Sequence, residues 1–440
     1  MPNPGIANST LLWEENQQQA RSTDPFMLGS EKTRHAVDPC ASSPAPHIVV
    51  GITSPQTCMV LTGRLRTLRE AGFRVTLVSG PGQLFDRLAL REGVERFAVP
   101  MNRGITPLKD IVSFVRLWRL LRRLKPDISE FSTPKAGLLG TLAACFAGVP
   151  RRVYMLRGLR LETAKGLKRA ILLLAERVSA SCAHVVLCNS ASLRAKALAL
   201  RVAPAAKLHL LGTGSSNGVD IERFFPGLSD LRDRLNLPAN APVLGFVGRL
   251  TEDKGLPDLV DAFDLILELQ PNAYLLAVGW FDDSEDALDA KLRARIENHP
   301  RIICTGYMEN TAPCYRAMDL LILPTWREGF PNAVLEASAT GIPVITTLST
   351  GARDAVVPEV TGLLIPPGYP EAICEAVLKL LRDPERCRRM GAAARSRVIE
   401  HFVNGHILGL TAAFYKSLLR LPSDRTGQGV ASMDSALPLG

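Results

Sequence analysis

Short apolar runs alternate with helix-length amphipathic segments along most of the chain. In the first half, strand-like runs occur at 47–52, 73–79, 94–99, 127–131, 151–156, 184–188 and 207–211, with helical patterns between them, notably at 108–124 and 165–180. After a Gly/Ser/Asn-rich break, further runs occur at 243–248, 273–279, 301–304, 319–323 and 343–347. Such alternation is typical of parallel βαβ units. It predicts an α/β protein with two doubly wound, Rossmann-like domains joined near residues 212–226, with a cleft between the carboxyl ends of their strands.

The composition of the segments predicts the domain limits. Residues 1–45 are rich in Ser, Pro, Asn and Gln without periodicity, and 421–440 are similar, so both are expected to be disordered tails. Between them we expect an N-terminal domain at 46–215 and a C-terminal domain at 216–400. The segment 401–420 is expected to be a helix that can cross back to the first domain.

The composition limits the class of protein. Of the 440 residues, 46% are hydrophobic and 22% are charged, as in folded soluble proteins. No apolar run is long enough to span a bilayer, and the N-terminus has no basic segment followed by an apolar core. The nine cysteines are dispersed without a CxxC pair, which favours neither a disulfide framework nor a zinc site. These features predict a cytoplasmic protein.

Charge is distributed unevenly along the chain. Residues 46–220 contain 27 Lys and Arg against 10 Asp and Glu, a net charge of +17, whereas the whole chain carries +9. A basic half predicts a polyanionic partner on one side of the protein. Nucleic acid and an anionic membrane surface are the two alternatives.

The segment 245–255 (GFVGRLTEDKG) has the composition of an anion-binding turn. A buried strand leads to Gly248, then Arg249, a polar turn, Lys254 and a helix from about Pro257. Glycine lets the backbone approach a ligand, and a helix N-terminus offers free N–H groups. Together with the two cations, this turn can neutralise a diphosphate without a metal. The alternative is an ordinary strand–helix turn with two solvated cations.

The segment 319–347 places two carboxylates near the end of a strand. Glu328 lies in a Gly-containing loop, Pro331 sits where a helix can begin, and Glu336 falls on that helix, eight residues after Glu328. Carboxylates accept hydrogen bonds from sugar hydroxyls, and a helix start accepts phosphate oxygens. The pair therefore predicts a site for a phosphorylated, polyhydroxylated ligand.

These segments resemble a known family. The sequence E-G-F-P-N-A-V-L-E followed by A-x-A-x-G-x-P-V is similar to the E-x7-E motif of retaining glycosyltransferases of family 4, which have the GT-B fold. G-R-L-x-x-x-K-G resembles their donor-phosphate motif. The linker Asn217-Gly218-Val219-Asp220 and the block 361–368 match in order. The resemblance covers roughly 46–420.

The resemblance implies a role for each matching residue. Glu328 would contact the donor sugar and the reacting region, Glu336 would hold the nucleotide ribose, and Arg249 and Lys254 would stabilise the leaving diphosphate. The other donor-binding positions implied are Gly248, Thr305, Gly306, Tyr307, Gly329, Phe330, Pro331 and Asn332. No metal and no cofactor are expected. The co-substrate would be a nucleotide-diphosphate sugar, and the resemblance favours a UDP-sugar because members of the family commonly use one.

Two positions depart from the family pattern. Residues 54–57 (Ser-Pro-Gln-Thr) replace a Gly-Gly pair that relatives often carry, and Arg157-Gly158 stands where many relatives have His-Gly. Arg157 cannot act as a base; it can bind an acceptor phosphate or a charged sugar, or be a solvated cation. The phrase around Lys135, with Arg157 and Arg160, resembles transferases of capsular and exopolysaccharide assembly that act on polyprenyl-diphosphate sugars. These three cations are the candidate acceptor-binding residues.

Cations beside apolar residues on 108–124 and 165–174 suggest a membrane-facing surface. A basic face next to apolar side chains suits a helix lying on an anionic leaflet, although solvated helix faces are the alternative. The acidic run 282–286 resembles the D-x-D metal site of another transferase fold, but its position in a polar loop favours a solvated turn.

Taken together, the sequence predicts a retaining, metal-independent hexosyl- or N-acetylhexosaminyltransferase. It would transfer a sugar from a nucleotide-diphosphate donor to a polyprenyl-diphosphate-linked saccharide in cell-surface polysaccharide assembly, at the cytoplasmic face of the membrane. Two alternatives remain: a nucleotide-sugar epimerase of the same fold, and a basic nucleic-acid-binding protein. The absence of G-x-G-x-x-G at the start of either domain disfavours a dinucleotide oxidoreductase.

Overall fold

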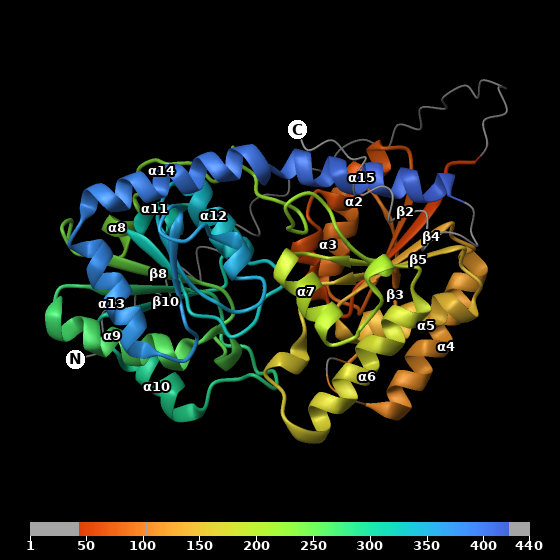
Figure 1. Ribbon diagram of the computed structural model, residues 1–440, viewed down its shortest axis with the longest axis horizontal. Helices are drawn as coiled ribbons and strands as arrows, with labels where there is room; N and C mark the ends of the chain where they lie inside the picture. The colour runs from red at the N-terminus through yellow and green to blue at the C-terminus, as the bar shows by residue number, and fades with distance from the viewer. Residues whose placement is uncertain (1–43, 103, 105, 422–440) are drawn as a thin grey trace.

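The protein consists of two α/β lobes side by side (Figure 1). The computed structural model describes residues 44–102, 104 and 106–421. The two predicted disordered tails lie outside the described residues, apart from 44, 45 and 421. Each lobe is built around one parallel sheet, with strand order β3-β2-β1-β4-β5-β6-β7 in the first and β10-β9-β8-β11-β12-β13 in the second.

The strands of the N-terminal lobe match all seven apolar runs of the first half to within one or two residues at each end. Three of the seven are buried along their whole length, as expected of strands covered on both faces. Their bounds are β1 His47–Gly51, β2 Arg74–Ser79, β3 Glu95–Ala98, β4 Ile128–Ser132, β5 Arg151–Leu156, β6 Val185–Cys188 and β7 Leu208–Leu210.

The C-terminal lobe confirms the five runs predicted there and adds a sixth strand. Its strands are β8 Val243–Val247, β9 Tyr274–Val278, β10 Ile302–Gly306, β11 Leu320–Leu323, β12 Val344–Thr347 and β13 Gly362–Ile365. The β13 segment is recognisable in the sequence only as part of the block 361–368 that resembles the family. A four-residue edge strand gives too short a periodic signal to be recognised alone.

Helices connect successive strands and cover both faces of each sheet. In the N-terminal lobe they are α2 Arg64–Glu70, α3 Gln83–Glu92, α4 Pro107–Leu124, α5 Pro134–Phe146, α6 Gly166–Cys182 and α7 Ala191–Ala199, with short 3-10 helices at Pro55–Leu61, Arg160–Glu162 and Ala205–Lys207. The predicted helices 108–124 and 165–180 correspond to α4 and α6. Proline at the first helical position of α4 and α5 fits its fixed φ.

In the C-terminal lobe the helices are α8 Leu231–Arg234, α9 Leu256–Leu269, α10 Ala290–Asn298, α11 Ala312–Ala317, α12 Asn332–Thr340, α13 Pro370–Leu381 and α14 Pro384–His401, with 3-10 helices at Glu252–Lys254 and Arg353–Ala355. The last helix, α15 Asn404–Arg420, follows α14 and lies along the N-terminal lobe (Figure 1). Its residues Phe414, Tyr415 and Leu418 belong to the hydrophobic core of that lobe.

A buried ion pair joins α15 to the first lobe. The Arg64 guanidinium donates to the Glu130 carboxylate at 2.7 Å and to the backbone carbonyl of Ser216 at 3.1 Å. The Tyr415 hydroxyl donates to the same carboxylate. Because Arg64 and Glu130 are almost completely buried, removing either partner would leave an unpaired buried charge. The network therefore ties α2, β4, the interdomain linker and α15 together.

Candidate active site between the lobes

The turn after β8 carries the two predicted phosphate-binding cations. Gly248 has φ of 156° and Gly255 has φ of 74°, both in the region that favours glycine. A Cβ on Gly255 would lie 2.1 Å from the carbonyl oxygen of Pro324, so this glycine lets the start of α9 approach the loop after β11. Arg249 and Lys254 lie between the two glycines and are thereby held next to that loop.

Lys254 and Glu328 form an ion pair. The Lys254 ammonium donates to the Glu328 carboxylate, and each side chain is only 15% exposed. These residues are 74 positions apart in the sequence, and one comes from the turn after β8 while the other comes from the loop after β11. The two predicted segments therefore meet at one place, at the carboxyl ends of neighbouring strands. The roles implied for the two residues remain predictions.

Arg249 is held by two carboxylates. Its guanidinium lies 2.8 Å from Asp282 and 3.4 Å from Asp253. Burial opposes the charged form, but Asp253 and Asp282 outweigh it and raise the pKa of Arg249. The same balance works in reverse at Asp253, where burial is outweighed by Lys254, Arg327 and Arg249, so that its pKa is lowered. Arg249 is therefore a fixed cation at the site.

The segment 282–286 is only partly the solvated acidic turn that was predicted: Asp283 and Glu285 are exposed, but several of its carboxylates are paired with cations. Asp282 pairs with Arg249, Asp286 accepts a hydrogen bond from Arg327 at 3.0 Å, and Glu285 pairs with Arg160 and Lys168 at 3.0 and 2.8 Å. Sequence alone does not show that this turn, which follows β9, lies against cations from three other segments. In the part of the chain that the structure describes, no group of three or more His, Cys, Asp and Glu side chains is arranged to hold a metal.

Glu336 lies in the second turn of α12. The Tyr315 hydroxyl donates to its Oε2 at 2.7 Å, and burial raises the pKa of Glu336 although that hydrogen bond opposes the shift. Pro331 precedes the helix in an extended conformation instead of occupying its first turn, and α12 begins at Asn332.

The backbone N–H groups before and at the start of α12 are available to a ligand. Those of Gly329, Phe330 and Asn332 donate to no partner among the described residues. The Phe330 ring packs 5.3 Å from that of Phe402, which fixes the loop. Free N–H groups at a helix start favour an anion.

The region that the family resemblance assigns to the nucleotide base of the donor contains two aromatic rings. Tyr307 follows β10, directly after Gly306, and its ring packs edge-on to Trp280 with centroids 5.7 Å apart. The preceding Thr305 is buried in β10. The Tyr307 hydroxyl lies 3.8 Å from the Met59 sulfur, across the junction between the lobes.

Arg157 and Gly158 of the first lobe face the loop that carries Gly329 in the second lobe. A Cβ on Gly329 would lie 2.2 Å from the Arg157 carbonyl oxygen, so the two lobes touch at this point through backbone atoms. The Arg157 Nε and one Nη are buried without a hydrogen-bond partner. Burial and the nearby Arg64 lower the pKa of Arg157 to about 10, although Glu130 acts in the opposite direction. Arg157 therefore carries unused donors at the interface.

The other two candidate acceptor-binding residues are already paired. Lys135 donates to Asp110 at 2.5 Å within the first lobe. Arg160 pairs with Glu285 of the second lobe. Their assignment as acceptor-binding residues remains a prediction, and an acceptor would have to compete with these carboxylates.

Sequence reasoning missed several residues that hold the lobes together. Arg327 donates to Thr163 of the first lobe at 3.0 Å and to Asp253 at 2.9 Å within its own lobe. Thr350 donates to Glu162 at 2.6 Å, and Ser192 donates to Asp354. Arg327 directly precedes Glu328 in the sequence, and this position is the one feature that could have identified it. The partners of the other residues come from distant segments and give no local pattern.

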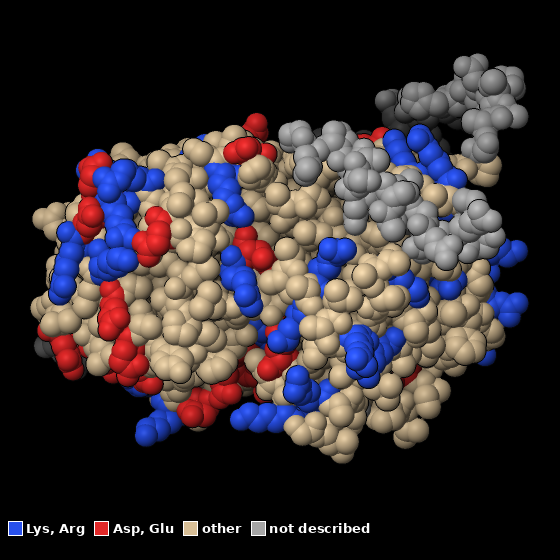
Figure 2. Space-filling view, in the orientation of Figure 1, with Lys and Arg blue, Asp and Glu red and all other residues tan. Residues whose placement is uncertain are grey.

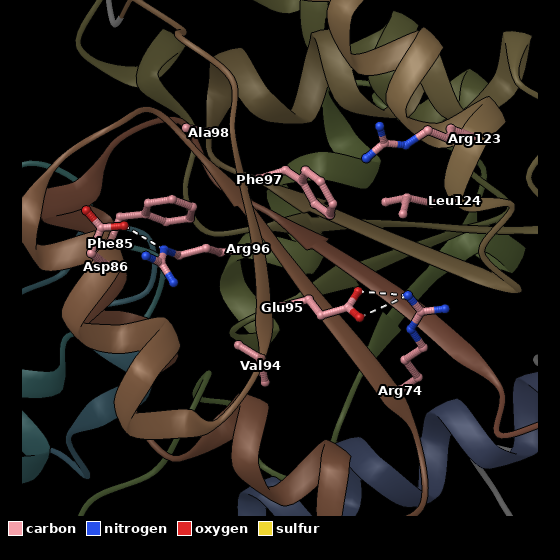
Figure 3. A pocket seen from close by; sticks show the side chains of 10 residues that line it. All are labelled: Arg74, Phe85, Asp86, Val94, Glu95, Arg96, Phe97, Ala98, Arg123 and Leu124. Atoms are coloured by element: carbon pink, nitrogen blue, oxygen red, sulfur yellow. Dashed lines mark hydrogen bonds and ion pairs between the residues drawn. The ribbon is translucent and has the colours of Figure 1, made fainter. Parts of the chain in front are cut away.

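A shallow pocket of about 760 Å³ lies elsewhere, along edge strand β3. Figure 3 shows that ion pairs between Arg74 and Glu95 and between Arg96 and Asp86 cross it, and Arg123 lies over Phe97. None of the predicted site residues lines it. The pocket offers little free charge, because most of its ionic groups are paired with each other.

Two parallel-sheet lobes that meet at a charged junction are the architecture expected from the resemblance to GT-B glycosyltransferases, and comparisons with known proteins show the family. Residues 60–214 match the model described as "Glycosyl transferase 4-like domain", and residues 229–397 match "Glycosyl transferases group 1". The chain belongs to this glycosyltransferase family.

Two curated relatives extend over most of the chain. The capsular polysaccharide biosynthesis glycosyltransferase CapM of Staphylococcus aureus is 33% identical over 370 residues, 84% of this chain and 96% of the relative. An Escherichia coli UDP-Gal:alpha-D-GlcNAc-diphosphoundecaprenol alpha-1,3-galactosyltransferase is 29% identical over 71% of this chain and 81% of its own.

Solved structures confirm the predicted fold. Anabaena Alr3699/HepE in complex with UDP-glucose aligns with a TM-score of 0.69 and 18% identity, covering 84% of this chain and 99% of that one. The sucrose-phosphate synthase of Thermosynechococcus elongatus aligns with a TM-score of 0.70 at 21% identity, with the same coverage. Among the described residues, no helix is both long and apolar enough to cross a bilayer.

Proposed function

We propose that this glycosyltransferase transfers a hexosyl or N-acetylhexosaminyl group from a UDP-sugar to a lipid-diphosphate-linked saccharide during cell-surface polysaccharide assembly, with retention at the anomeric carbon. The observation that carries the proposal is the Lys254–Glu328 ion pair beside the contact between Gly329 and Arg157. It joins a cation suited to a diphosphate and a carboxylate suited to sugar hydroxyls, beside a point where the two lobes touch.

The relatives support the substrate classes. The E. coli relative is named for UDP-Gal and a diphosphoundecaprenol-linked GlcNAc, and CapM is named for capsular polysaccharide biosynthesis. The Anabaena structure holds UDP-glucose. The alignments with the first two cover 84% and 71% of this chain, which is more than either lobe alone, so donor and acceptor classes of this kind fit it.

In the proposed mechanism, negative charge develops on the diphosphate as it leaves the sugar. As the bond between the anomeric carbon and the phosphate oxygen breaks, the acceptor hydroxyl oxygen bonds to the same face of that carbon. The acceptor proton passes to the departing diphosphate oxygen. Arg249 and Lys254 stabilise the negative charge that develops on this leaving group, and the free N–H groups of Gly329 and Phe330 assist them. No metal ion is needed in this scheme, because two cations and the helix start supply the positive charge.

The carboxylates have positioning roles. Glu328, held by Lys254, accepts hydrogen bonds from donor-sugar hydroxyls, and Glu336 accepts them from the nucleotide ribose. Thr305, Gly306 and Tyr307 lie beside the base. The donor phosphate must compete with the Glu328 carboxylate for the Lys254 ammonium. When the phosphate binds Lys254, the Glu328 carboxylate becomes available to the sugar hydroxyls.

Acceptor binding is assigned to the first lobe. Arg157 has two buried nitrogen atoms without partners, and a phosphate or sugar carboxylate can supply the missing acceptors. Arg160 and Lys135 lie on the same lobe and can contribute after exchange of their present partners. The acceptor lipid implies that the enzyme works at the cytoplasmic surface of the membrane as a peripheral protein.

A donor panel tests the proposal. The full-length protein is incubated with UDP- and GDP-sugars and a lipid-diphosphate monosaccharide, and products are identified by mass spectrometry and by the anomeric coupling constant in NMR spectra. We expect transfer of one sugar with the donor's anomeric configuration. An inverted product would contradict retention, and conversion of the donor without acceptor would indicate an epimerase instead.

A further inference from the structure

Of the ten large apolar side chains that are exposed among the described residues of the first lobe, six lie on the N-terminal halves of α4 and α6. Leu108 and Leu167 are 81% and 77% exposed, and the other members are at least 44% exposed. We call this surface the α4/α6 apolar edge; it consists of Leu108, Ile111 and Val112 on α4 and Leu167, Ile171 and Leu174 on α6. Large apolar side chains gathered in this way mark an interaction surface.

The spacing shows that these side chains form two stripes. The α4 residues are at positions i, i+3 and i+4, and the α6 residues are at i, i+4 and i+7, so each set lies on one face of its helix. α5 lies between α4 and α6 and packs against both. The outward faces of both outer helices therefore carry apolar side chains that neither lobe covers.

Cations surround this edge. On α4 the exposed stripe continues from Leu108 and Val112 to Arg116 and Arg119, and on α6 Lys165 and Arg169 flank Leu167. Arg116, Arg119, Lys165 and Arg169 form no ion pair with any residue that the structure describes. Figure 2 shows more Lys and Arg than Asp and Glu on the visible face of this lobe. The partner must therefore accept both apolar side chains and unpaired positive charge.

The edge lies at the reaction end of the lobe. Helices that follow strands of a parallel sheet begin at the carboxyl ends of those strands, so the first turns of α4 and α6 are on the side that faces the second lobe (Figure 1). Lys168, in the first turn of α6, reaches across to Glu285. A partner seated on this edge would lie beside the junction between the lobes.

We propose that the α4/α6 apolar edge inserts into the anionic leaflet of a membrane. A leaflet offers hydrocarbon for the leucine and isoleucine side chains and anionic headgroups for the flanking cations at the same depth. Docking in this orientation places the junction between the lobes at the bilayer surface. The membrane contact deepens the proposed function, because an acceptor with a lipid anchor would then reach the site by lateral diffusion.

Vesicle binding of the full-length protein tests the contact directly. Vesicles of phosphatidylcholine with and without phosphatidylglycerol are sedimented with the wild-type protein and with the combined variant Leu108→Ser, Ile111→Ser, Leu167→Ser, Ile171→Ser. We expect wild-type binding that needs phosphatidylglycerol and weakens with salt, and a loss of roughly tenfold or more in the variant even at low salt. Because the four side chains are exposed, the variant should fold, which circular dichroism and the Tm verify.

Two further variants sharpen the test. The matched control Leu228→Ser, Leu269→Ser removes exposed leucines of the second lobe, and it should bind like the wild type. Arg116→Gln, Arg119→Gln, Lys165→Gln, Arg169→Gln should lose most of the salt-sensitive binding. Equal vesicle binding by the wild type and the apolar-edge variant would overturn the proposal. The proposal would also be overturned if the wild-type protein were a dimer and the apolar-edge variant a monomer. The edge would then bind a second copy of the chain and not a membrane.

Activity assays separate this proposal from the proposed function. A water-soluble acceptor with a short lipid should be turned over equally by the wild type and the apolar-edge variant, whereas a vesicle-embedded acceptor should be turned over more slowly by the variant. If the variant loses vesicle binding but no acceptor reacts even with wild type, the docking surface stands and the acceptor assignment fails. If the variant slows with both acceptors alike, the edge acts on the reaction and not on docking.

Discussion

The two lobes contain the same chemical pair, a glutamic acid hydrogen-bonded by a tyrosine hydroxyl, in two different settings. In the first lobe Tyr154 of β5 donates to Glu176 of α6, and in the second Tyr315 of α11 donates to Glu336 of α12, both at 2.7 Å. Burial raises the pKa of both carboxyls, to about 7 for Glu176. A perturbed carboxyl therefore does not by itself mark a functional site.

The difference lies in where each pair sits. Glu176 is in the middle of α6 and bonds to a strand of the sheet, whereas Glu336 is on α12, the helix that follows the loop carrying Glu328. The same contrast holds for cations. Those of the second lobe that matter to the site, Arg249 and Lys254, are fixed by carboxylates, whereas the exposed arginines of α4 have no ionic partner among the described residues. In the function that we propose, the second lobe holds the donor and the first lobe faces the membrane surface.

The largest expected effect is at the cations of the second lobe. Lys254→Ala or Arg249→Ala should lower kcat about 10²- to 10³-fold, because charge on the leaving diphosphate loses a fixed partner. Steady-state kinetics with a saturating donor measures this, and the Tm should change little. Arg116→Ala, on the first lobe, is the control and should retain normal turnover with a soluble acceptor. Near-normal turnover in both site variants would remove the basis for the proposed mechanism.

The next effect concerns the contact between the lobes. Gly329→Ala places a Cβ against the Arg157 carbonyl oxygen, and backbone atoms cannot move aside as a flexible side chain can. The lobes must separate slightly, and kcat/KM should fall roughly 100-fold, as for other small misplacements of reacting groups. Gly405→Ala, whose Cβ meets open space in α15, is the matched control. If Gly329→Ala behaves like that control, the close approach is not required for catalysis.

Arg157 should show opposite effects on stability and activity. Arg157→Met removes a buried guanidinium with unpaired donors, so the free energy of unfolding should stay equal or increase. Turnover should fall roughly 10- to 100-fold if the guanidinium binds an anionic group of a substrate. Thermal melts and acceptor KM values measure the two effects. A destabilised variant with normal KM would show that Arg157 has only a structural role.

The two Glu–Tyr pairs should respond differently to neutral glutamine. The pKa of Glu176 is about 7 when folded and near 4.3 when unfolded, so its stabilising contribution is complete below about pH 4 and is lost as pH rises through 7. Glu176→Gln should therefore match the wild type near pH 4 and exceed it at pH 8, by on the order of 3 kcal/mol, with normal kinetics. Glu336→Gln should raise the donor KM about tenfold, because a charge-assisted hydrogen bond to the ribose is lost. Equal kinetic effects of both changes would contradict the distinction between the pairs.

The smallest expected effect is at the ion pairs across the junction. Glu285→Ala leaves Arg160 and Lys168 without their shared partner, and partly exposed pairs contribute only about 0–1 kcal/mol each. Turnover should change by less than about fivefold, and the difference from the wild type should vanish at high salt. Assays at two ionic strengths measure it. A large, salt-independent loss would show that the acidic turn has a role beyond holding the lobes.

Much of the fold was available from the sequence. Twelve of the strands described here follow apolar runs, since a strand covered on both faces must be apolar throughout. β13 was not predicted as a strand, because it is short and lies at the edge of the sheet. Of the site, the sequence identified the turn after β8 and the loop after β11. It did not show that the acidic turn pairs with cations, and it did not identify Arg327, because ion pairs between distant segments leave no periodic pattern.

The sequence by itself determined the alternation of strands and helices, the charge imbalance between the halves, and which residues follow which strand, because each of these depends on neighbours in the chain. Only the tertiary structure decided that Lys254 meets Glu328, that Gly329 touches Arg157, and that the apolar residues of α4 and α6 remain uncovered. These are properties of packing between segments 70 to 170 residues apart. Local periodicity specifies which face a side chain occupies within its element, but only the packed lobes determine what that face meets.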